Sequence, residues 1–328
     1  MSSSDPAAAG GAVRAASPRT GLAALRRSTL FYPLIGLAVV CLIMVFASDS
    51  FLSVNNLSNV GRQVSINALI AVGMTFVILT GGIDLSVGSV MALSGTLAAG
   101  LMIGGVPAVL ALVVCLLVGL AFGVFNGALV AYGRMPPIIV TLATMGIARG
   151  LALIYTHGYP IDGLPGWIAF FGSGTLFGLQ MPIVITILVY AVAWVVLERM
   201  PVGRYVYAIG GNESATRLSG VRVGRFKMIV YAVSGLTSAI AGIVITARLM
   251  SGQPNAGVGF ELDAIAAVVL GGTAISGGRG SIIGTLLGAL LLGVLNNGLN
   301  MVHVDPYVQN VIKGGIILLA IYIGRDQR

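Results

Sequence analysis

Residues 106–132 read VPAVLALVVCLLVGLAFGVFNGALVAY and contain no charged side chain. A helix needs about 20 mostly apolar residues to cross the hydrocarbon core of a bilayer. This stretch is longer, so it can tilt strongly or break near Gly119 or Gly123. Because backbone groups find no water partner in lipid, a continuous apolar stretch of this length must be helical there. The stretch therefore predicts a transmembrane helix.

The composition of the whole chain points the same way. Hydrophobic residues make up 57% of the 328 residues and charged residues only 9%, against roughly 25% charged in a typical soluble domain. The mean hydropathy is +1.01. A chain with so few charges cannot cover a water-facing surface, which excludes soluble, disordered, coiled-coil and disulfide-scaffold classes. The apolar runs are continuous, whereas the strands of a membrane β-barrel alternate over about 10 residues.

The sequence predicts an all-α polytopic membrane protein with about ten transmembrane helices. These occupy a transmembrane domain over residues 30–324, between a Ser/Ala/Pro/Arg-rich tail (1–29), which we expect to be disordered, and a short tail (325–328). Arg26 and Arg27 precede the first run as in a signal peptide, but the run is long for one, so we expect a retained helix. The predicted spans are 30–47, 64–80, 86–103, 106–132, 138–156, 182–198, 228–247, 261–277, 281–301 and 307–324.

The basic residues predict the orientation, because cytoplasmic loops carry an excess of Arg and Lys. With the N-terminus in the cytoplasm, 14 of the 18 basic residues lie on that side, many of them in the loop 199–227. Both termini are then cytoplasmic. The loop 157–181 is periplasmic, and its Gly, Pro and Trp167 favour a short interfacial element. Four charged residues near the outer side either meet a partner protein or form a solvated rim: Asp162, Arg248, Glu261 and Asp263.

The chain carries no motif for nucleotide, metal or nucleic-acid chemistry of its own. A P-loop requires a lysine directly after a glycine, whereas Lys227 and Lys313, the only lysines, follow Phe226 and Ile312. Two histidines far apart and two cysteines inside apolar runs predict neither a metal site nor a disulfide framework. The basic clusters are explained as topology signals. We therefore expect no catalytic residues and no cofactor bound by this chain.

The cytoplasmic loop contains a short predicted helix. Asn212 is suited to accept hydrogen bonds from the first backbone amides. Glu213 lies at the positive end of the helix and Arg217 nearer its negative end, and both placements favour the helix dipole. Gly220 suits the left-handed position after the last turn. A helix of about seven residues is marginal in water by itself, so it is either a capped surface helix or one that docks on a partner.

Asp84 lies in the sequence Gly-Gly-Ile-Asp-Leu-Ser between two predicted spans. An ionisable residue in a membrane segment costs about 2.5–3.5 kcal/mol on insertion scales, which makes it a functional candidate. Asp84 and Ser86 could line a polar pathway, where the carboxylate would accept hydrogen bonds from hydroxyl groups. Asp84 could instead cap the next helix, and the two roles are compatible.

Amide side chains recur inside the predicted spans. Asn296, Asn297 and Asn300 share one face of the ninth span, and amide groups in lipid face protein or water. They either line a pathway or form hydrogen bonds between helices. Weaker candidates of the same kind are Asn67, Asn126, Thr141 and Thr144.

Glycines repeat at every fourth position in two places, a spacing that lets helices approach closely. We expect helix packing there; a contact that moves during gating is the alternative. Residues 77–89 also resemble 269–281, since each joins two spans through a glycine-rich break. The similarity indicates either an internal repeat with broken helices or glycine packing alone. The repeated glycines are Gly119, Gly123 and Gly127, and Gly280, Gly284 and Gly288.

Four motifs, in the same order, resemble those of the ribose-type sugar permeases of bacterial ABC importers. They are NALIAVGMTFVILTGGIDLSVGS (67–89), GGNESATRLSGV (210–221), ELDAIAAVVLGGT (261–273) and GTLLGALLLGVLNNGLN (284–300). The resemblance covers roughly residues 50–324.

The resemblance implies a permease in the bacterial inner membrane, moving a monosaccharide such as ribose by alternating access. It implies a homodimer, a cytoplasmic ABC ATPase that holds the ATP and Mg, a periplasmic sugar-binding protein, and contact with membrane lipids. Another cargo, such as a hexose, polyol or furanosyl signal molecule, stays open, as does an ion-coupled secondary transporter. The residues expected to contact the ATPase are Gly210, Gly211, Asn212, Glu213, Ser214, Ala215, Thr216, Arg217, Leu218, Ser219 and Gly220.

Overall fold

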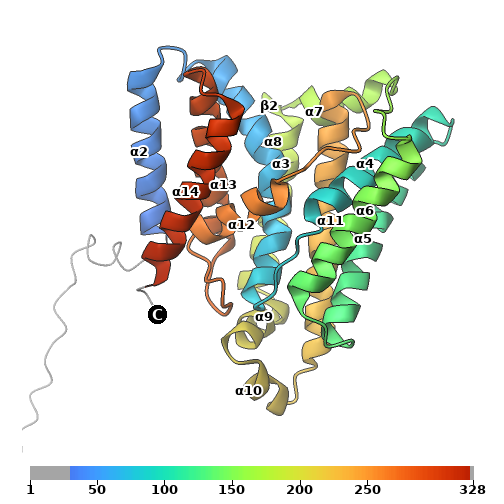
Figure 1. Ribbon diagram of the computed structural model, residues 1–328, viewed down its shortest axis with the longest axis vertical. Helices are drawn as coiled ribbons and strands as arrows, with labels where there is room; N and C mark the ends of the chain where they lie inside the picture. The colour runs from blue at the N-terminus through green and yellow to red at the C-terminus, as the bar shows by residue number, and fades with distance from the viewer. Residues whose placement is uncertain (1–29, 326–328) are drawn as a thin grey trace, which may run out of the picture.

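The computed structural model describes residues 30–325 and is a bundle of helices with one small hairpin (Figure 1). The predicted N-terminal tail and residues 326–328 lie outside the described part. Each predicted span corresponds to one helix, and the bounds are α2 (Phe31–Ala47), α3 (Val54–Leu79), α4 (Val87–Ile103), α5 (Ala108–Ala131), α6 (Pro137–Thr156), α8 (Met181–Glu198), α11 (Val223–Leu249), α12 (Phe260–Leu270), α13 (Ile282–Met301) and α14 (Pro306–Arg325).

Within residues 30–325, six helices are long and apolar enough to cross a membrane: α3, α5, α6, α8, α11 and α13. Two more, α2 and α4, are shorter apolar helices. The described chain begins and ends at the end of the bundle that carries α9 and α10 (Figure 1). A chain that crosses a membrane an even number of times begins and ends on the same side, as the prediction of ten spans requires.

The eighth span is not the continuous helix that was predicted over 261–277. Helix α12 has only 11 residues and ends at Leu270. Gly272, Gly277 and Gly278 then adopt positive φ angles of 87°, 85° and 74°, which are left-handed conformations that glycine reaches without a Cβ penalty. The chain continues without helix over 271–281, and Figure 1 shows this loop descending from α12 towards α9. Non-helical backbone is tolerated at this depth only where it is buried in protein or lines a cavity.

A second break separates α3 from α4. Helix α3 ends at Leu79, Gly81 has a φ angle of 77°, and α4 begins only at Val87. The two segments that resemble each other in sequence are thus both breaks between helices. They also lie side by side, because the Gly278 amide donates to the Leu79 carbonyl at 3.0 Å.

Most of the repeated glycines pack helices together, as predicted, whereas Gly280 lies in the break before α13. A methyl group at Gly119 or Gly123 of α5 would overlap backbone carbonyl oxygens of α11, at Gly235 and Tyr231. Gly284 and Gly288 face Gly271 and Ala267 in the same way. Helix α5 does not break at Gly119 or Gly123 but runs unbroken from Ala108 to Ala131, because this backbone contact with α11 supports it there.

The two larger loops form short elements at opposite ends of the bundle. One end carries η1 (Gly166–Ile168), α7 (Ala169–Ser173) and the antiparallel pair β1 (Thr175–Leu176) and β2 (Leu179–Gln180), in which Thr175 pairs with Gln180. The other end carries α9 (Pro201–Gly211) and α10 (Glu213–Leu218), the lowest helices in Figure 1. The two loops therefore face opposite sides of a membrane.

We expect single cysteines at these two ends to react from opposite sides. In a variant without Cys41 and Cys115, Glu213→Cys should be modified by an impermeant thiol reagent only from the cytoplasm, and Asp162→Cys only from outside. The reason is that the basic residues concentrate at the α9–α10 end. Labelling of intact cells and of inverted vesicles measures both, and the reverse pattern would refute the orientation.

Candidate functional site

Helix α10 is a capped single helix that stands out from the bundle. The Asn212 side chain accepts from the backbone amide of Ala215 at 2.9 Å, as predicted for the N-cap. Gly220 has a φ angle of 84° beyond the last turn. Leu218, in the last turn, is 89% exposed. A large apolar side chain that is exposed at the end of a capped helix indicates a helix that docks on a partner. It does not fit a helix that stays free at the surface.

Glu213 ties α10 to the helix that follows it. Its carboxylate accepts from Arg217 at 2.7 Å and from Lys227 of α11 at 2.6 Å. Partial burial raises the pKa of Glu213, but the hydrogen bonds and charges of Lys227 and Arg217 lower it more, so the net pKa lies below its ordinary value. The stabilisation from these pairs is therefore complete above the ordinary glutamate pKa and is lost as the pH falls through the lower folded-state pKa. At cytoplasmic pH the carboxylate is charged and both pairs are intact.

Helix α9 fixes the base of α10. Thr216 donates its hydroxyl to the carbonyl of Ala208 at 2.9 Å. Tyr207 of α9 donates to the carbonyl of Gly280 at 3.1 Å, in the break between α12 and α13. Burial, with a further contribution from Glu198, raises the pKa of Tyr207 to about 12, so its hydroxyl keeps its proton and remains a donor. Helix α9, which leads into the predicted ATPase-contacting segment, is thus hydrogen-bonded to the break between α12 and α13.

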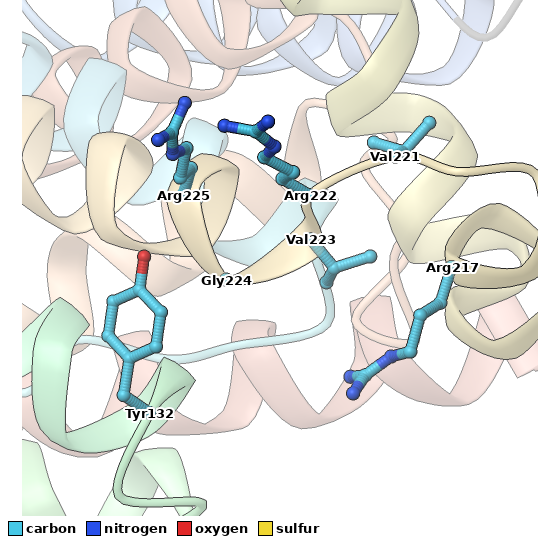
Figure 2. A pocket seen from close by; sticks show the side chains of 7 residues that line it. All are labelled: Tyr132, Arg217, Val221, Arg222, Val223, Gly224 and Arg225. Carbon is cyan, nitrogen blue, oxygen red and sulfur yellow. The ribbon is translucent and has the colours of Figure 1, made fainter.

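A basic hollow of about 320 Å³ lies beside α10 (Figure 2). Arg222 and Arg225 point to the same side of it, and the Tyr132 hydroxyl faces the first turn of α11 from across the hollow. Neither arginine has an ion pair within residues 30–325. Two unpaired like charges next to an exposed apolar tip fit an acidic partner surface by charge complementarity. The full lining is Tyr132, Arg217, Val221, Arg222, Val223, Gly224 and Arg225.

Asp84 lies at the centre of a buried polar network. It is 1% exposed, and its carboxylate accepts from the Ser86 amide at 3.0 Å, the Ser86 hydroxyl at 2.6 Å and the Ser234 hydroxyl at 2.7 Å. The bond to the Ser86 amide closes a turn just before α4, whose N-cap residue is Ser86, so Asp84 does not accept from the amides of α4 itself as the capping alternative supposed. Lining a pathway remains a prediction for Asp84 and Ser86. Ser234 is the residue that sequence reasoning missed, because nothing distinguishes it from other serines in apolar helices.

Two of the weaker candidates join this network. Asn126 of α5 donates to the Ser86 hydroxyl at 2.9 Å, and Thr141 of α6 donates to the Ile83 carbonyl at 3.2 Å. Thr144, by contrast, bonds only to carbonyls of its own helix. The break before α4 is therefore held by side chains from α5, α6 and α11.

The three asparagine side chains of α13 do not form one polar cluster. Asn297 exchanges two hydrogen bonds with Asn56 of α3, at 3.1 and 2.9 Å, and Asn300 accepts from Gln309 at 2.8 Å. These two therefore bond between segments, the alternative to lining a pathway. Asn67 and Asn296 differ, because the buried carbonyl oxygen of each side chain has no hydrogen-bond partner among the described residues. Those two oxygens are available to a hydroxyl donor, so Asn67 and Asn296 remain predictions for the pathway.

Charged side chains hold the segment that leads into α12. Arg149 of α6 donates to the carbonyls of Pro254 and Ala256. Asp263, in the first turn of α12, pairs with Lys313 of α14 at 3.5 Å, and each side chain is 19% exposed. Asp263 is thus an intramolecular ion-pair partner, not a solvated rim residue.

Comparison with known proteins shows the family to which the chain belongs. The family described as branched-chain amino acid transport system / permease component matches residues 56–321. The chain is 51% identical to the ribose import permease protein of Bacillus subtilis (strain 168) over 90% of this chain and 92% of that one. It is 49% identical to the ribose import permease protein of Escherichia coli (strain K12), over 90% and 93%. It is 39% identical to the D-allose transport system permease protein of the same strain, over 87% and 88%.

Proposed function

Because the chain belongs to the family of branched-chain amino acid transport system permease components, we propose that it imports a monosaccharide, ribose or another pentose, as the membrane-spanning subunit of an ATP-driven transporter. The observation that carries the proposal is the identity of about half of the residues to ribose import permeases along nearly the whole chain. The chain is a multi-pass permease of the ABC sugar importer class, located in the bacterial inner membrane.

Hydrolysis of ATP takes place on a separate cytoplasmic subunit. The chain has no lysine after a glycine, and therefore no P-loop to hold phosphates. The structure offers instead a docking element, α10, with an exposed leucine and a basic hollow beside it. In this proposal residues Gly210 to Gly220 contact the ATPase, which holds the ATP and Mg, and this chain binds no cofactor itself.

The sugar passes between two copies of this subunit by alternating access. A periplasmic sugar-binding protein delivers it to the end of the bundle that carries α7 and the hairpin. The binding protein sets most of the selectivity, because few buried amide oxygens in the described part of the chain are free to contact a sugar, namely those of Asn67, Asn126, Gln180 and Asn296. Tight binding of sugar to the purified permease alone would count against this division of roles.

Uptake of radiolabelled monosaccharides tests the cargo. A strain lacking this subunit should lose ribose uptake and regain it with the plasmid-borne gene, while allose and other hexoses should be poorer cargo, since the D-allose permease is the more distant relative. Depletion of ATP should stop the uptake, whereas an uncoupler applied with ATP held constant should not. Uptake that survives ATP depletion but collapses with the uncoupler would indicate ion-coupled transport.

A further inference from the structure

Three backbone segments that are far apart in the sequence meet in one place at the α9 end of the bundle. They are Leu79–Gly81 at the end of α3, Gly210–Gly211 at the end of α9, and Gly277–Gly278 in the break before α13. We call them together the glycine junction. Besides the bond from the Gly278 amide to the Leu79 carbonyl, a Cβ at Gly277 would lie 2.8 Å from the Gly81 nitrogen, and one at Gly278 would lie 2.7 Å from the Gly211 nitrogen.

The junction packs backbone on backbone. A methyl group at Gly210 would overlap both the carbonyl oxygen of Leu79 and the amide nitrogen of Gly278. No side chain separates the three segments at these points, so no rotamer change can absorb a displacement of one segment relative to another. Closely packed protein interiors transmit strain. A movement of the end of α9 must therefore displace the other two segments.

The three segments lead to the parts of the chain that would have to move together. Gly211 is followed, after Asn212, directly by α10, the proposed ATPase contact. Gly81 opens the break that contains Asp84, and Gly277–Gly278 belongs to the break that follows α12. The bond from the Tyr207 hydroxyl to the Gly280 carbonyl links α9 to that second break once more, at 3.1 Å.

We propose that the glycine junction transmits movement of α10 to both broken segments of the membrane domain, and that Gly210 is its positioning residue. The inference rests on the proposed function, in which a separate ATPase moves α10. It assigns to Gly210 a requirement for the absence of a side chain.

Gly146 supplies a control outside the junction and outside the proposed ATPase contact. It lies inside α6, and a Cβ there would meet nothing within 4 Å. Replacing glycine with alanine inside a helix is mildly favourable where space allows, so Gly146→Ala should be neutral for both folding and transport. Any difference between the two variants then reports the junction and not the helix propensity of the substitution.

The test uses the complete transporter of permease, ATPase and sugar-binding protein in proteoliposomes, with labelled ribose as the probe. Sugar taken up and ATP hydrolysed are measured in the same sample. For Gly210→Ala we expect the number of sugars moved per ATP to fall at least tenfold while the binding-protein-loaded complex still hydrolyses ATP. For Gly146→Ala the ratio should equal that of the wild type. Equal ratios for both variants would overturn the proposal.

A second variant, which removes the hydrogen bond between α9 and the break before α13, tests the proposal if the Gly210→Ala complex does not assemble. Tyr207→Phe removes the hydroxyl that bonds to Gly280 and leaves the ring in place, and we expect a two- to threefold lower ratio of sugar to ATP. An unchanged ratio in an assembled Tyr207→Phe complex would then overturn the proposal. Failure of the proposed function is distinguishable, because in that case the wild-type complex itself moves no sugar.

Discussion

Glu213→Arg is expected to reduce ATP-coupled uptake by more than 90% while the protein still inserts into the membrane. The carboxylate pairs with Arg217 and Lys227, and reversing its charge places a third positive group between them. Like charges at this spacing repel, and the new arginine at the first turn opposes the helix dipole. The link between α10 and α11 should then be lost. Transport assays in proteoliposomes, with membrane content measured by immunoblot, check the result.

Charge reversals at the two partners of Glu213 serve as controls for this prediction. Arg217→Glu should also impair uptake, because it removes one of the two partners of Glu213 and adds a repulsive charge. Combining Glu213→Arg with Lys227→Glu restores an opposite-charge pair between α10 and α11, and we expect it to recover part of the lost uptake. If Glu213→Arg and Arg217→Glu both transported normally, α10 would not be the coupling element.

Asp84→Ala is expected to destabilise the membrane domain by about 3 kcal/mol, since it leaves the Ser86 amide and the Ser86 and Ser234 hydroxyls without their acceptor. Each buried polar group that loses its partner costs about 1–3 kcal/mol. The Asn126 amide, which donates to Ser86, is placed by the same network. Thermal unfolding of the purified permease in detergent measures the loss.

The conservative variant Asp84→Asn separates the two roles of the residue. Its amide oxygen can still accept from the Ser86 amide, so the support of the backbone before α4 is kept and the stability should lie closer to that of the wild type. A purely structural role predicts that uptake in Asp84→Asn follows stability. A fall in uptake without a fall in stability would show that the carboxylate also acts in the pathway. Wild-type stability of Asp84→Ala would contradict the network itself.

The predictions from sequence that succeeded rest on local physics. The apolar runs located the apolar helices because the bilayer sets their length, except that the run over 261–277 contains only the short helix α12. The caps of α10 were predicted because Asn212, Glu213, Arg217 and Gly220 act within one helical turn of their own backbone. The spacing of Gly119 and Gly123 likewise predicted close packing, since positions four apart share a helix face.

The predictions that failed or stayed open depend on residues distant in the chain. The continuous span over 261–277 was wrong because apolar composition does not reveal that Gly272, Gly277 and Gly278 take left-handed conformations against a neighbouring backbone. The partners of Asn297 and Asp84, namely Asn56 and Ser234, lie in other helices, and no spacing within the chain indicates them.

The sequence by itself therefore determined that this is a multi-pass helical membrane protein, where most of its apolar helices lie, and how the short helix α10 is capped. These properties follow from hydropathy, length and turn chemistry, which each segment carries alone. Only the tertiary structure decided that the ends of α3, α9 and the break after α12 touch through glycine backbones. Such contacts depend on the absence of side chains at three places at once, and their meeting is created by the packing of helices from all parts of the chain.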